Sequence, residues 1–124
     1  MGLDQWIFKK TDGEITIDDE SVCYWRKCNQ IHKYFDTLCD GVENCGKYTV
    51  TLQDLKHLKN LCEQVLKARN AKTSRKLLPH TRGSFFGAYE YDKFYYMELE
   101  HTIKQIDEVI ASDEGDEYYY RSWW

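Results

Sequence analysis

Two stretches of the chain carry an apolar side chain at every third or fourth position, and this spacing limits the fold more than any other feature. Such a repeat places apolar side chains on one face of an α-helix, because a helix turns about once every 3.6 residues. The repeat predicts one helix from Leu52 to about Arg69 and another from about Tyr91 to Ser112. Thr51 and Asp54 resemble a capping box at the start of the first helix, with Asp in place of Glu or Gln. The apolar positions are Leu55, Leu58, Cys62, Val65 and Leu66 in the first helix, and Tyr95, Leu99, Ile103, Ile106 and Ile110 in the second.

A third amphipathic pattern runs through "CYWRKCNQIHKYF" and predicts a helix from about Val22 to Cys39. Gly41 follows this stretch and suits the left-handed conformation that commonly ends a helix. The expected core face of the helix consists of Tyr24, Cys28, Ile31, Phe35 and Leu38.

Short runs near both ends of the chain predict β-strands. Residues 5–10 and 14–18 are rich in Trp, Ile, Phe and Thr. Asp12-Gly13 between them suits a tight turn, so a β-hairpin is expected. The other expected strands are "KYTV" at 47–50, residues 84–89 and the tail "YYYRSWW" at 118–124.

Together these elements predict a single domain over residues 1–124 of the α+β class, with three amphipathic helices packed on a small, mostly antiparallel β-sheet. A chain of 124 residues is long enough for one hydrophobic core and too short for two. The connection "NAKTSRKLLPHTRG" at 70–83 follows neither pattern, so a long loop is expected there.

The formal net charge of −4 hides an uneven distribution. Residues 64–89 contain no Asp or Glu, although the whole chain has 21 of them. This basic segment is either a solvated loop balanced by the acidic C-terminal segment or a docking site for phosphates or an acidic partner. Its positive charges are Lys67, Arg69, Lys72, Arg75, Lys76 and Arg82.

The composition and motifs also predict where the chain acts and what it does not bind. No leader is visible, and no window approaches the roughly 18 apolar residues of a membrane span. A cytoplasmic location without a membrane partner is therefore expected, with the five cysteines as reduced thiols. Their spacing fits no usual zinc site, so no metal is expected. Neither GxxxxGK[ST] nor GxGxxG occurs, and no cofactor is expected.

The helix expected at 22–39 carries a second stripe beside its core face, formed by Trp25, Asn29, His32 and Asp36 and flanked by Arg26. The stripe offers an aromatic surface, an amide and an imidazole that a carboxylate one turn away can orient. The structural alternative packs the tryptophan at the sheet edge and bonds the amide and imidazole to loop carbonyls. No Ser or Cys nucleophile is placed beside the imidazole, so the stripe is interpreted as a binding surface rather than a catalytic site.

The basic connection is a second candidate surface. It supplies Lys72, Arg75, Lys76 and Arg82, and aromatic residues follow it. Cations beside aromatic rings suit anions or nucleic acid. The structural alternative is a loop whose aromatic side chains at 85–86 fill the core.

The C-terminal tail is a third candidate surface. In a strand, side chains alternate between faces, which places Tyr119, Arg121 and Trp123 together. Aromatic residues occur on both faces of the tail, so at least one face packs on the helices or meets a partner. Phe94, Met97 and His101, on the outer side of the last helix, could extend such a patch.

Several motifs, taken in order, resemble a family of small phage and prophage proteins: "GLDQWIF", "YWRKCNQIHKYF", "NCGKYTV", "LLPHTRGSFFGAYEYDKFYY" and "YYYRSWW". The resemblance covers nearly the whole chain. Some members are labelled phosphoglycerate kinase, although 124 residues cannot supply two nucleotide-binding lobes. The resemblance implies a bacteriophage gene product that acts in the bacterial cytoplasm, and it carries over no catalytic residues.

The leading hypothesis is a non-enzymatic binding protein that inhibits a host defence system, such as a CRISPR nuclease, or another host enzyme by direct protein contact. The first alternative is a small-ligand protein that binds or hydrolyses nucleotides or phosphates. In it, His32 and Asp36 would form the polar centre, and Arg26, Lys27 and Arg82 would clamp the phosphates. The second alternative is single-strand nucleic-acid binding through the basic connection, which the net negative charge disfavours.

Overall fold

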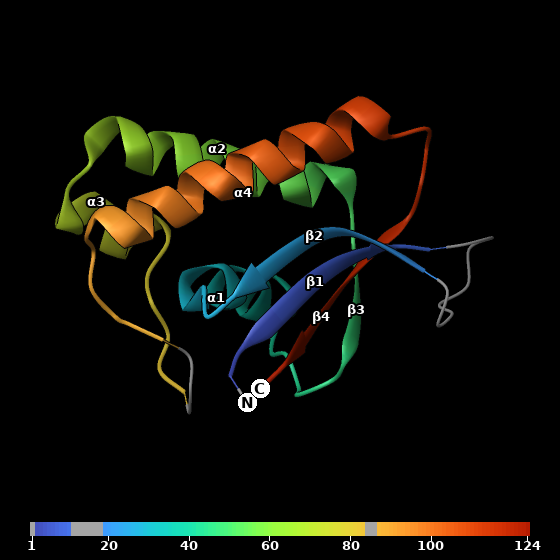
Figure 1. The fold of residues 1–124 in the computed structure, drawn as a ribbon, viewed down its shortest axis with the longest axis horizontal. Helices are drawn as coiled ribbons and strands as arrows, with labels where there is room; N and C mark the ends of the chain where they lie inside the picture. The colour runs from blue at the N-terminus through green and yellow to red at the C-terminus, as the bar shows by residue number, and fades with distance from the viewer. Residues whose placement is uncertain (1, 11–18, 84–86) are drawn as a thin grey trace.

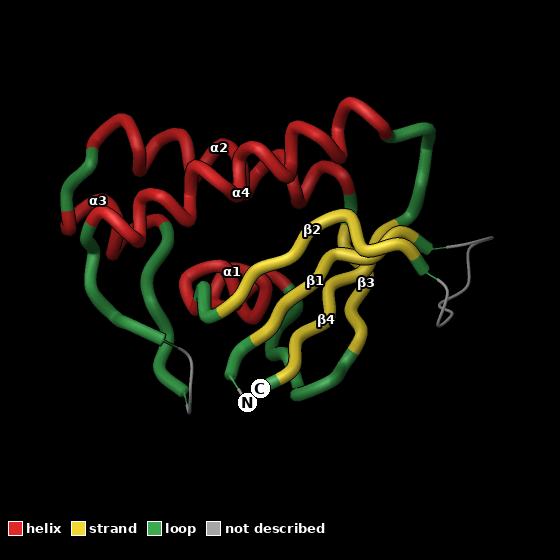
Figure 2. Tube along the Cα trace, viewed as in Figure 1, coloured by secondary structure: helices red, strands yellow, loops and turns green. Residues whose placement is uncertain are grey.

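The computed structural model describes residues 2–10, 19–83 and 87–124, which form an antiparallel sheet with helices packed on one of its faces (Figures 1 and 2). Helix α1 lies directly against the sheet, and α2 and α4 run beside each other beyond it. The strands are β1 Asp4–Lys9, β2 Glu20–Arg26, β3 Lys47–Val50 and β4 Tyr118–Trp123. The helices are α1 Asn29–Leu38, α2 Leu52–Ala68, α3 Ala71–Leu77 and α4 Lys93–Ser112.

The first and last strands of the chain are neighbours in the middle of the sheet. The strand order is β2-β1-β4-β3, and every adjacent pair is antiparallel. Asp4 of β1 lies opposite Trp123 of β4, so the two ends of the chain meet (Figure 1). Because successive side chains of a strand point to opposite faces, Gln5 and Ile7 face the helices and Trp6 faces away from them.

Aromatic side chains join the sheet to the helices. Phe35 of α1 stacks on Tyr120 of β4, with their ring centroids 4.2 Å apart. Trp25 of β2 extends to α4, where its indole Nε1 donates to Thr102 Oγ1 at 2.9 Å. These rings bury large apolar areas, and the indole nitrogen keeps a hydrogen-bond partner as buried polar groups require.

The two long predicted helices are confirmed as α2 and α4. Thr51 Oγ1 accepts from the backbone N–H of Asp54 at 3.1 Å, and the Asp54 carboxylate accepts from the N–H of Thr51 at 2.8 Å. This reciprocal pair is the predicted capping box. Arg69 ends α2 in the left-handed conformation, with φ 46°. The apolar stripe is buried at Leu55, Leu58, Cys62, Val65, Tyr95, Leu99 and Ile106, and partly buried at Leu66, Ile103 and Ile110.

The prediction of a continuous helix from Val22 to Cys39 is wrong. Its first part is strand β2, in which the side chains of Cys23 and Trp25 are buried and Tyr24 between them is exposed. Lys27 then takes a left-handed backbone conformation with φ 55°, which belongs to neither a strand nor a right-handed helix. Helix α1 therefore begins only at Asn29.

This correction changes the expected core face of that segment. Cys28, Ile31 and Phe35 are buried as predicted. Tyr24 is 41% exposed because its strand points it away from the helices, and Leu38 is 41% exposed at the last position of α1. Gly41 has the predicted positive φ, 105°, and its N–H donates to the carbonyl of Asp36 at 2.8 Å.

The connection at 70–83 is not the long loop that was expected. Asn70 caps a short helix, α3, by accepting from the N–H of Thr73 through its side chain at 2.8 Å. The buried Ser74 stabilises α3, because its hydroxyl donates to the carbonyl of Asn70 at 2.8 Å. The α+β class is confirmed: the described residues form four helices instead of three, and every strand pair in their sheet is antiparallel.

The remaining strand predictions fall partly on described residues. Strands β3 and β4 are confirmed at 47–50 and 118–123. The N-terminal run is confirmed as β1, which pairs with β2. The second run of the expected hairpin, 14–18, lies outside the described residues, as do residues 84–86 of the expected strand at 84–89. Its described part, residues 87–89, forms no strand, so that part of the prediction is wrong.

Candidate functional site

The predicted stripe of Trp25, Asn29, His32 and Asp36 does not form a surface. Trp25 lies in β2 with its side chain in the core, only 2% exposed, while Arg26 beside it points to the opposite face. Asn29 and His32 lie in α1 and are also buried. The change from strand to helix at Lys27 separates the tryptophan from the other three residues.

Asn29 holds the segment after α3 against the start of α1 through hydrogen bonds. Its Nδ2 donates to the carbonyl of Ala88 at 2.9 Å, and its Oδ1 accepts from the N–H of Thr81 at 2.9 Å. The same Oδ1 lies 2.6 Å from Nδ1 of His80, whose Nε2 is 2.8 Å from the carbonyl of Glu90. Asn29 therefore has a structural role as the anchor of this segment, close to the structural alternative noted from the sequence.

His32 belongs to a buried chain of hydrogen bonds between α1 and the sheet. Gln5 donates through Nε2 to the carbonyl of Cys28 at 2.9 Å, which leaves Gln5 Oε1 to accept from the Tyr120 hydroxyl at 2.8 Å. The Tyr120 oxygen in turn lies 2.9 Å from His32 Nδ1, so this nitrogen carries the proton and donates. Burial lowers the pKa of His32, and the charge of Asp36 opposes this shift in part. His32 is accordingly a neutral core residue.

Asp36 is engaged in the turn after α1 rather than in orienting the imidazole. Its Oδ1 accepts from the N–H of Val42 at 2.8 Å. The polar centre that the sequence suggested for nucleotide or phosphate chemistry is therefore divided between a buried imidazole and a turn.

The cations of the basic connection lie on and after α3. Lys72, Arg75 and Lys76 are exposed on this helix. Arg75 lies over the ring of Tyr91 at 5.8 Å from its centroid, and Arg82 lies over the ring of Tyr89 at 5.1 Å. Both arginines thus have aromatic partners within the chain.

The candidate site is the face of the sheet that points away from the helices. In one row across the strands, Tyr24, Trp6 and Arg121 lie opposite one another. In the next row, Arg26 and Trp123 lie on either side of Asp4. We call these side chains the outer sheet face: Asp4, Trp6, Tyr24, Arg26, Arg121 and Trp123.

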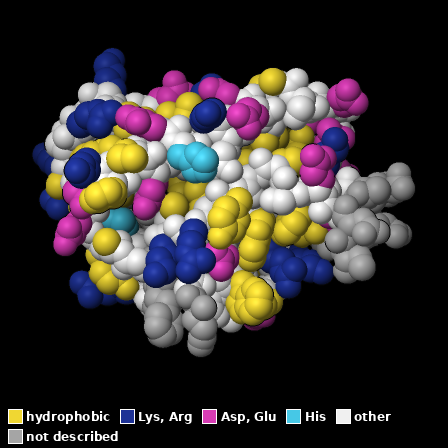
Figure 3. Space-filling model, in the orientation of Figure 1, with side chains coloured by type: hydrophobic (Ala, Val, Ile, Leu, Met, Phe, Trp, Pro, Cys, Tyr) yellow, Lys and Arg dark blue, Asp and Glu magenta, His cyan; other side chains and the backbone are white. Residues whose placement is uncertain are grey.

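Two aromatic rings of the outer sheet face, those of Trp6 and Tyr24, belong to a series of ring contacts along the sheet. The Trp6 ring lies 5.8 Å from that of Tyr24 and 6.1 Å from that of Phe8. Phe8 stacks on Tyr119 at 5.3 Å, and the Tyr119 hydroxyl donates to Asp19 at 2.8 Å. Hydrophobic side chains gather over the strands in this orientation, with Lys and Arg beside them (Figure 3).

The outer sheet face carries the charges of Asp4, Arg26 and Arg121, with Lys47 beside Arg121. Asp4 accepts from the Tyr24 hydroxyl at 2.6 Å and lies 4.0 Å from a guanidinium nitrogen of Arg26. The hydrogen bond to Asp4 raises the pKa of Tyr24. Arg121 lies between Trp6 and Lys47 in its row, and its Nε is buried without a hydrogen-bond partner among the described residues.

The structure thus brings together four of the predicted site residues and separates the others. Arg26, Tyr119, Arg121 and Trp123 share the outer side of the sheet, with Tyr119 buried. Trp6 and Tyr24 were not among the candidates. The alternation in "DQWIFK" was a signal for Trp6, whereas the helix assigned to 22–39 placed Tyr24 in the core.

Residues 2–10, 19–83 and 87–124 provide neither a metal-binding cluster nor a membrane-spanning helix. Within these ranges, no group of three or more His, Cys, Asp and Glu side chains is placed to hold a metal ion. None of the helices described there has the length and apolar character needed to cross a membrane. All five cysteines are unpaired thiols. Burial raises the pKa of the Cys23 and Cys62 thiols to about 12, so both remain protonated near neutral pH.

Comparison of the chain with protein-family models, with curated proteins and with solved structures gives no match.

Proposed function

We propose that this chain is a binding protein whose outer sheet face docks on an acidic surface of a host protein. In this proposal the chain is encoded by a bacteriophage and acts in the cytoplasm of the bacterial host. It inhibits a host defence enzyme, such as a CRISPR nuclease, or another host enzyme by occupying its surface. The phage origin rests on the resemblance of the sequence motifs, and the docking rests on the geometry.

The observation that carries the docking is the grouping of Trp6, Tyr24 and Trp123 with two arginines on one side of the sheet. Trp, Tyr and Arg are the residue types that most often dominate the binding energy of protein interfaces. Trp123 is 59% exposed and Tyr24 is 41% exposed. Large aromatic surfaces of this kind are typical of interaction sites, because leaving them in water is unfavourable.

The charges of the outer sheet face indicate that its partner surface is acidic. Arg26, Arg121 and Lys47 are positive, whereas Asp4 is the negative group among them and already accepts from Tyr24. An acidic partner surface would be drawn toward this face and held in register by the arginines. The chain as a whole has a formal net charge of −4, and its other basic surface is the segment at 64–89, which contains no Asp or Glu.

The internal hydrogen bonds favour binding over catalysis. Asn29 and His32 are both buried, and both use their polar atoms to hold the fold. Neither is therefore placed to contact a substrate from outside.

The test compares two equally exposed aromatic residues. Trp123 is 59% exposed on the outer sheet face, and Phe94 is 60% exposed at the start of α4. Immobilised wild-type chain should capture a stoichiometric protein from a bacterial host lysate. Trp123→Ala should weaken the affinity for that protein more than about tenfold, and Phe94→Ala should leave it unchanged. If the captured protein is an enzyme, addition of the chain at a 1:1 molar ratio should inhibit its activity.

Two outcomes would contradict the proposal. Equal weakening by both substitutions would show that the outer sheet face is not the docking surface. A lysate that yields no stoichiometric partner would argue against the function as a whole.

A second candidate is single-strand nucleic-acid binding, since aromatic rings on an antiparallel sheet can stack on bases. The contact of Trp6 with Tyr24 beside Arg26 favours it. Filter binding of labelled oligonucleotides would then show retention that falls with salt and with Trp6→Ala. Retention that does not depend on salt excludes this candidate.

A further inference from the structure

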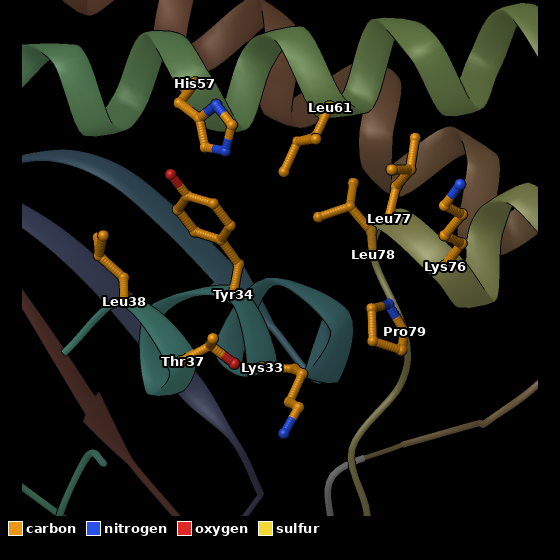
Figure 4. Close-up of a pocket in the computed structure, with 10 residues that line it drawn as sticks. All are labelled: Lys33, Tyr34, Thr37, Leu38, His57, Leu61, Lys76, Leu77, Leu78 and Pro79. Atoms are coloured by element: carbon orange, nitrogen blue, oxygen red, sulfur yellow. The ribbon is translucent and has the colours of Figure 1, made fainter. Parts of the chain in front are cut away.

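A pocket of about 370 Å³ lies on the helical side of the molecule, away from the outer sheet face (Figure 4). Its walls come from α1, α2, and α3 with the two residues that follow it. In the close-up, Tyr34, Leu61 and Leu78 point from three segments toward a common space. A volume of this size falls in the range of small-molecule sites.

The walls are mostly apolar, although Thr37 and His57 also line them, and their apolar side chains are held in place. The Tyr34 hydroxyl donates to the carbonyl of Asp54 at 2.7 Å. This bond fixes the Tyr34 ring against the pocket and uses the proton of its hydroxyl. Leu78 is 1% exposed and belongs to the core, and Leu61 packs against the same core. The pocket is therefore built on rigid packing and would offer an apolar chain a preformed site.

The charged groups of the pocket are all of one sign. Lys33 of α1 and Lys76 of α3 line it, and its lining contains no Asp or Glu. Neither lysine takes part in an ion pair within the described part of the chain. Two unpaired ammonium groups beside an apolar cavity complement a ligand that has an apolar body and an anionic head.

We propose that this pocket binds a small carboxylate with an unbranched apolar chain. The chain packs on Tyr34, Leu61 and Leu78. The carboxylate stays at the rim near Lys33 and Lys76. A carboxylate fits better than a phosphate here, since a phosphate needs several donors in a polar cradle and the pocket walls are mostly apolar.

The probe is decanoate, and decylammonium is its counterpart of equal chain length and opposite charge. Isothermal titration calorimetry should give a dissociation constant for decanoate on the order of 0.1 to 1 mM. Decylammonium should bind at least about tenfold more weakly. Amide chemical shifts should change at pocket residues and not on the outer sheet face.

Charge substitutions separate the head group from the chain. Lys33→Gln and Lys76→Gln should each weaken decanoate binding about two- to fivefold. Lys72→Gln is the matched control, because Lys72 is also exposed on α3 but does not line the pocket. Thr37→Trp places a large ring at an exposed position of the pocket wall and should abolish binding. Circular dichroism confirms that each variant is folded.

Several results would overturn the proposal. If decylammonium bound as tightly as decanoate, the pocket would have no preference for an anionic head group. If the folded Thr37→Trp variant bound decanoate as well as the wild type does, the ligand would bind outside this pocket. The absence of shifts up to several millimolar decanoate would exclude the site. A dimer, or a protein complex, that Thr37→Trp disrupts while decanoate has no effect would identify the pocket as a protein contact instead.

Discussion

Neighbouring residues of β2 lie in opposite environments. Trp25 is 2% exposed and reaches Thr102 through its indole nitrogen, whereas Tyr24 is 41% exposed and contacts Trp6. The alternation of a strand at the edge of the sheet explains the difference, since one face packs on helices and the other meets solvent. Two aromatic residues that look alike in the sequence thus have different roles.

Their substitution should show this difference in stability. Trp25→Ala should lower the free energy of unfolding by about 3 to 5 kcal/mol, because it leaves a cavity and removes the bond to Thr102. Tyr24→Ala should cost less than about 1 kcal/mol, since its ring lies at the surface. Urea unfolding followed by circular dichroism measures both. Equal losses would contradict the strand assignment of β2.

His32 should make stability depend on pH. Burial lowers its folded-state pKa below the unfolded value of about 6.5. The neutral form is therefore favoured by folding, so its contribution is fully present above about pH 6.5 and is lost as the pH falls toward the folded pKa. For this one group, the free energy of unfolding should fall by at most about 1.4 kcal/mol per pH unit.

The measurement is the free energy of unfolding between pH 7.5 and pH 5. His32→Gln keeps a donor for Tyr120 but cannot take up a proton. It should reduce the decrease and leave the part that comes from His80, whose pKa burial also lowers. His101→Gln, at an exposed position of α4, should retain the full decrease. A decrease that His32→Gln leaves unchanged would show that His32 is not neutral in the fold.

At the scale of elements, α4 protects the free edge of β2. Gln105 Oε1 accepts from the N–H of Tyr24 at 2.8 Å, and its Nε2 donates to the carbonyl of Tyr24 at 3.0 Å. Unpaired edge strands readily pair with other chains, and one glutamine here satisfies both groups of the exposed backbone unit. The helix thus takes the place of a further strand at this position.

Removing this side chain should loosen the edge. Gln105→Ala should lower the free energy of unfolding by about 1 to 2 kcal/mol and speed the hydrogen exchange of the Tyr24 amide. Lys104→Ala, at the neighbouring exposed position, is the control and should change neither quantity by a comparable amount. Unaltered exchange at Tyr24 in Gln105→Ala would show that the Gln105 side chain does not protect this edge of β2.

At the scale of the whole molecule, the last strand of the chain completes the sheet by pairing with two other strands. Strand β4 lies between β1 and β3, and its Tyr120 is part of the core. The pairing joins residues more than a hundred positions apart, as Asp4 and Trp123 show. Folding therefore requires both ends of the chain together.

A truncated chain tests this dependence. A chain that ends at Glu117 should not fold, because β1 and β3 lose the strand between them. A circular permutant that links the two ends and opens the turn at Gly115 should retain the fold, since it keeps every strand pair. Circular dichroism and heteronuclear NMR distinguish the two states. A folded truncated chain would contradict the central role of β4.

The outer sheet face shows how far the sequence could predict a site. Alternation in the tail placed Arg121 and Trp123 together, and this grouping is found in the structure. Trp6 and Tyr24 could not be added, because they come from two other strands. Which strands are neighbours depends on long-range pairing that local periodicity does not record.

The sequence by itself determined α2, α4 and the capping box, since helical periodicity and end capping are local properties of consecutive residues. Only the tertiary structure decided that "CYWR" is a strand and that Asn29 begins a helix. A short run rich in apolar residues suits both conformations, and sheet pairing with β1 settles the choice. The same pairing placed Arg26 in one row with Asp4 and Trp123 and buried Trp25, because a strand sends adjacent side chains to opposite faces.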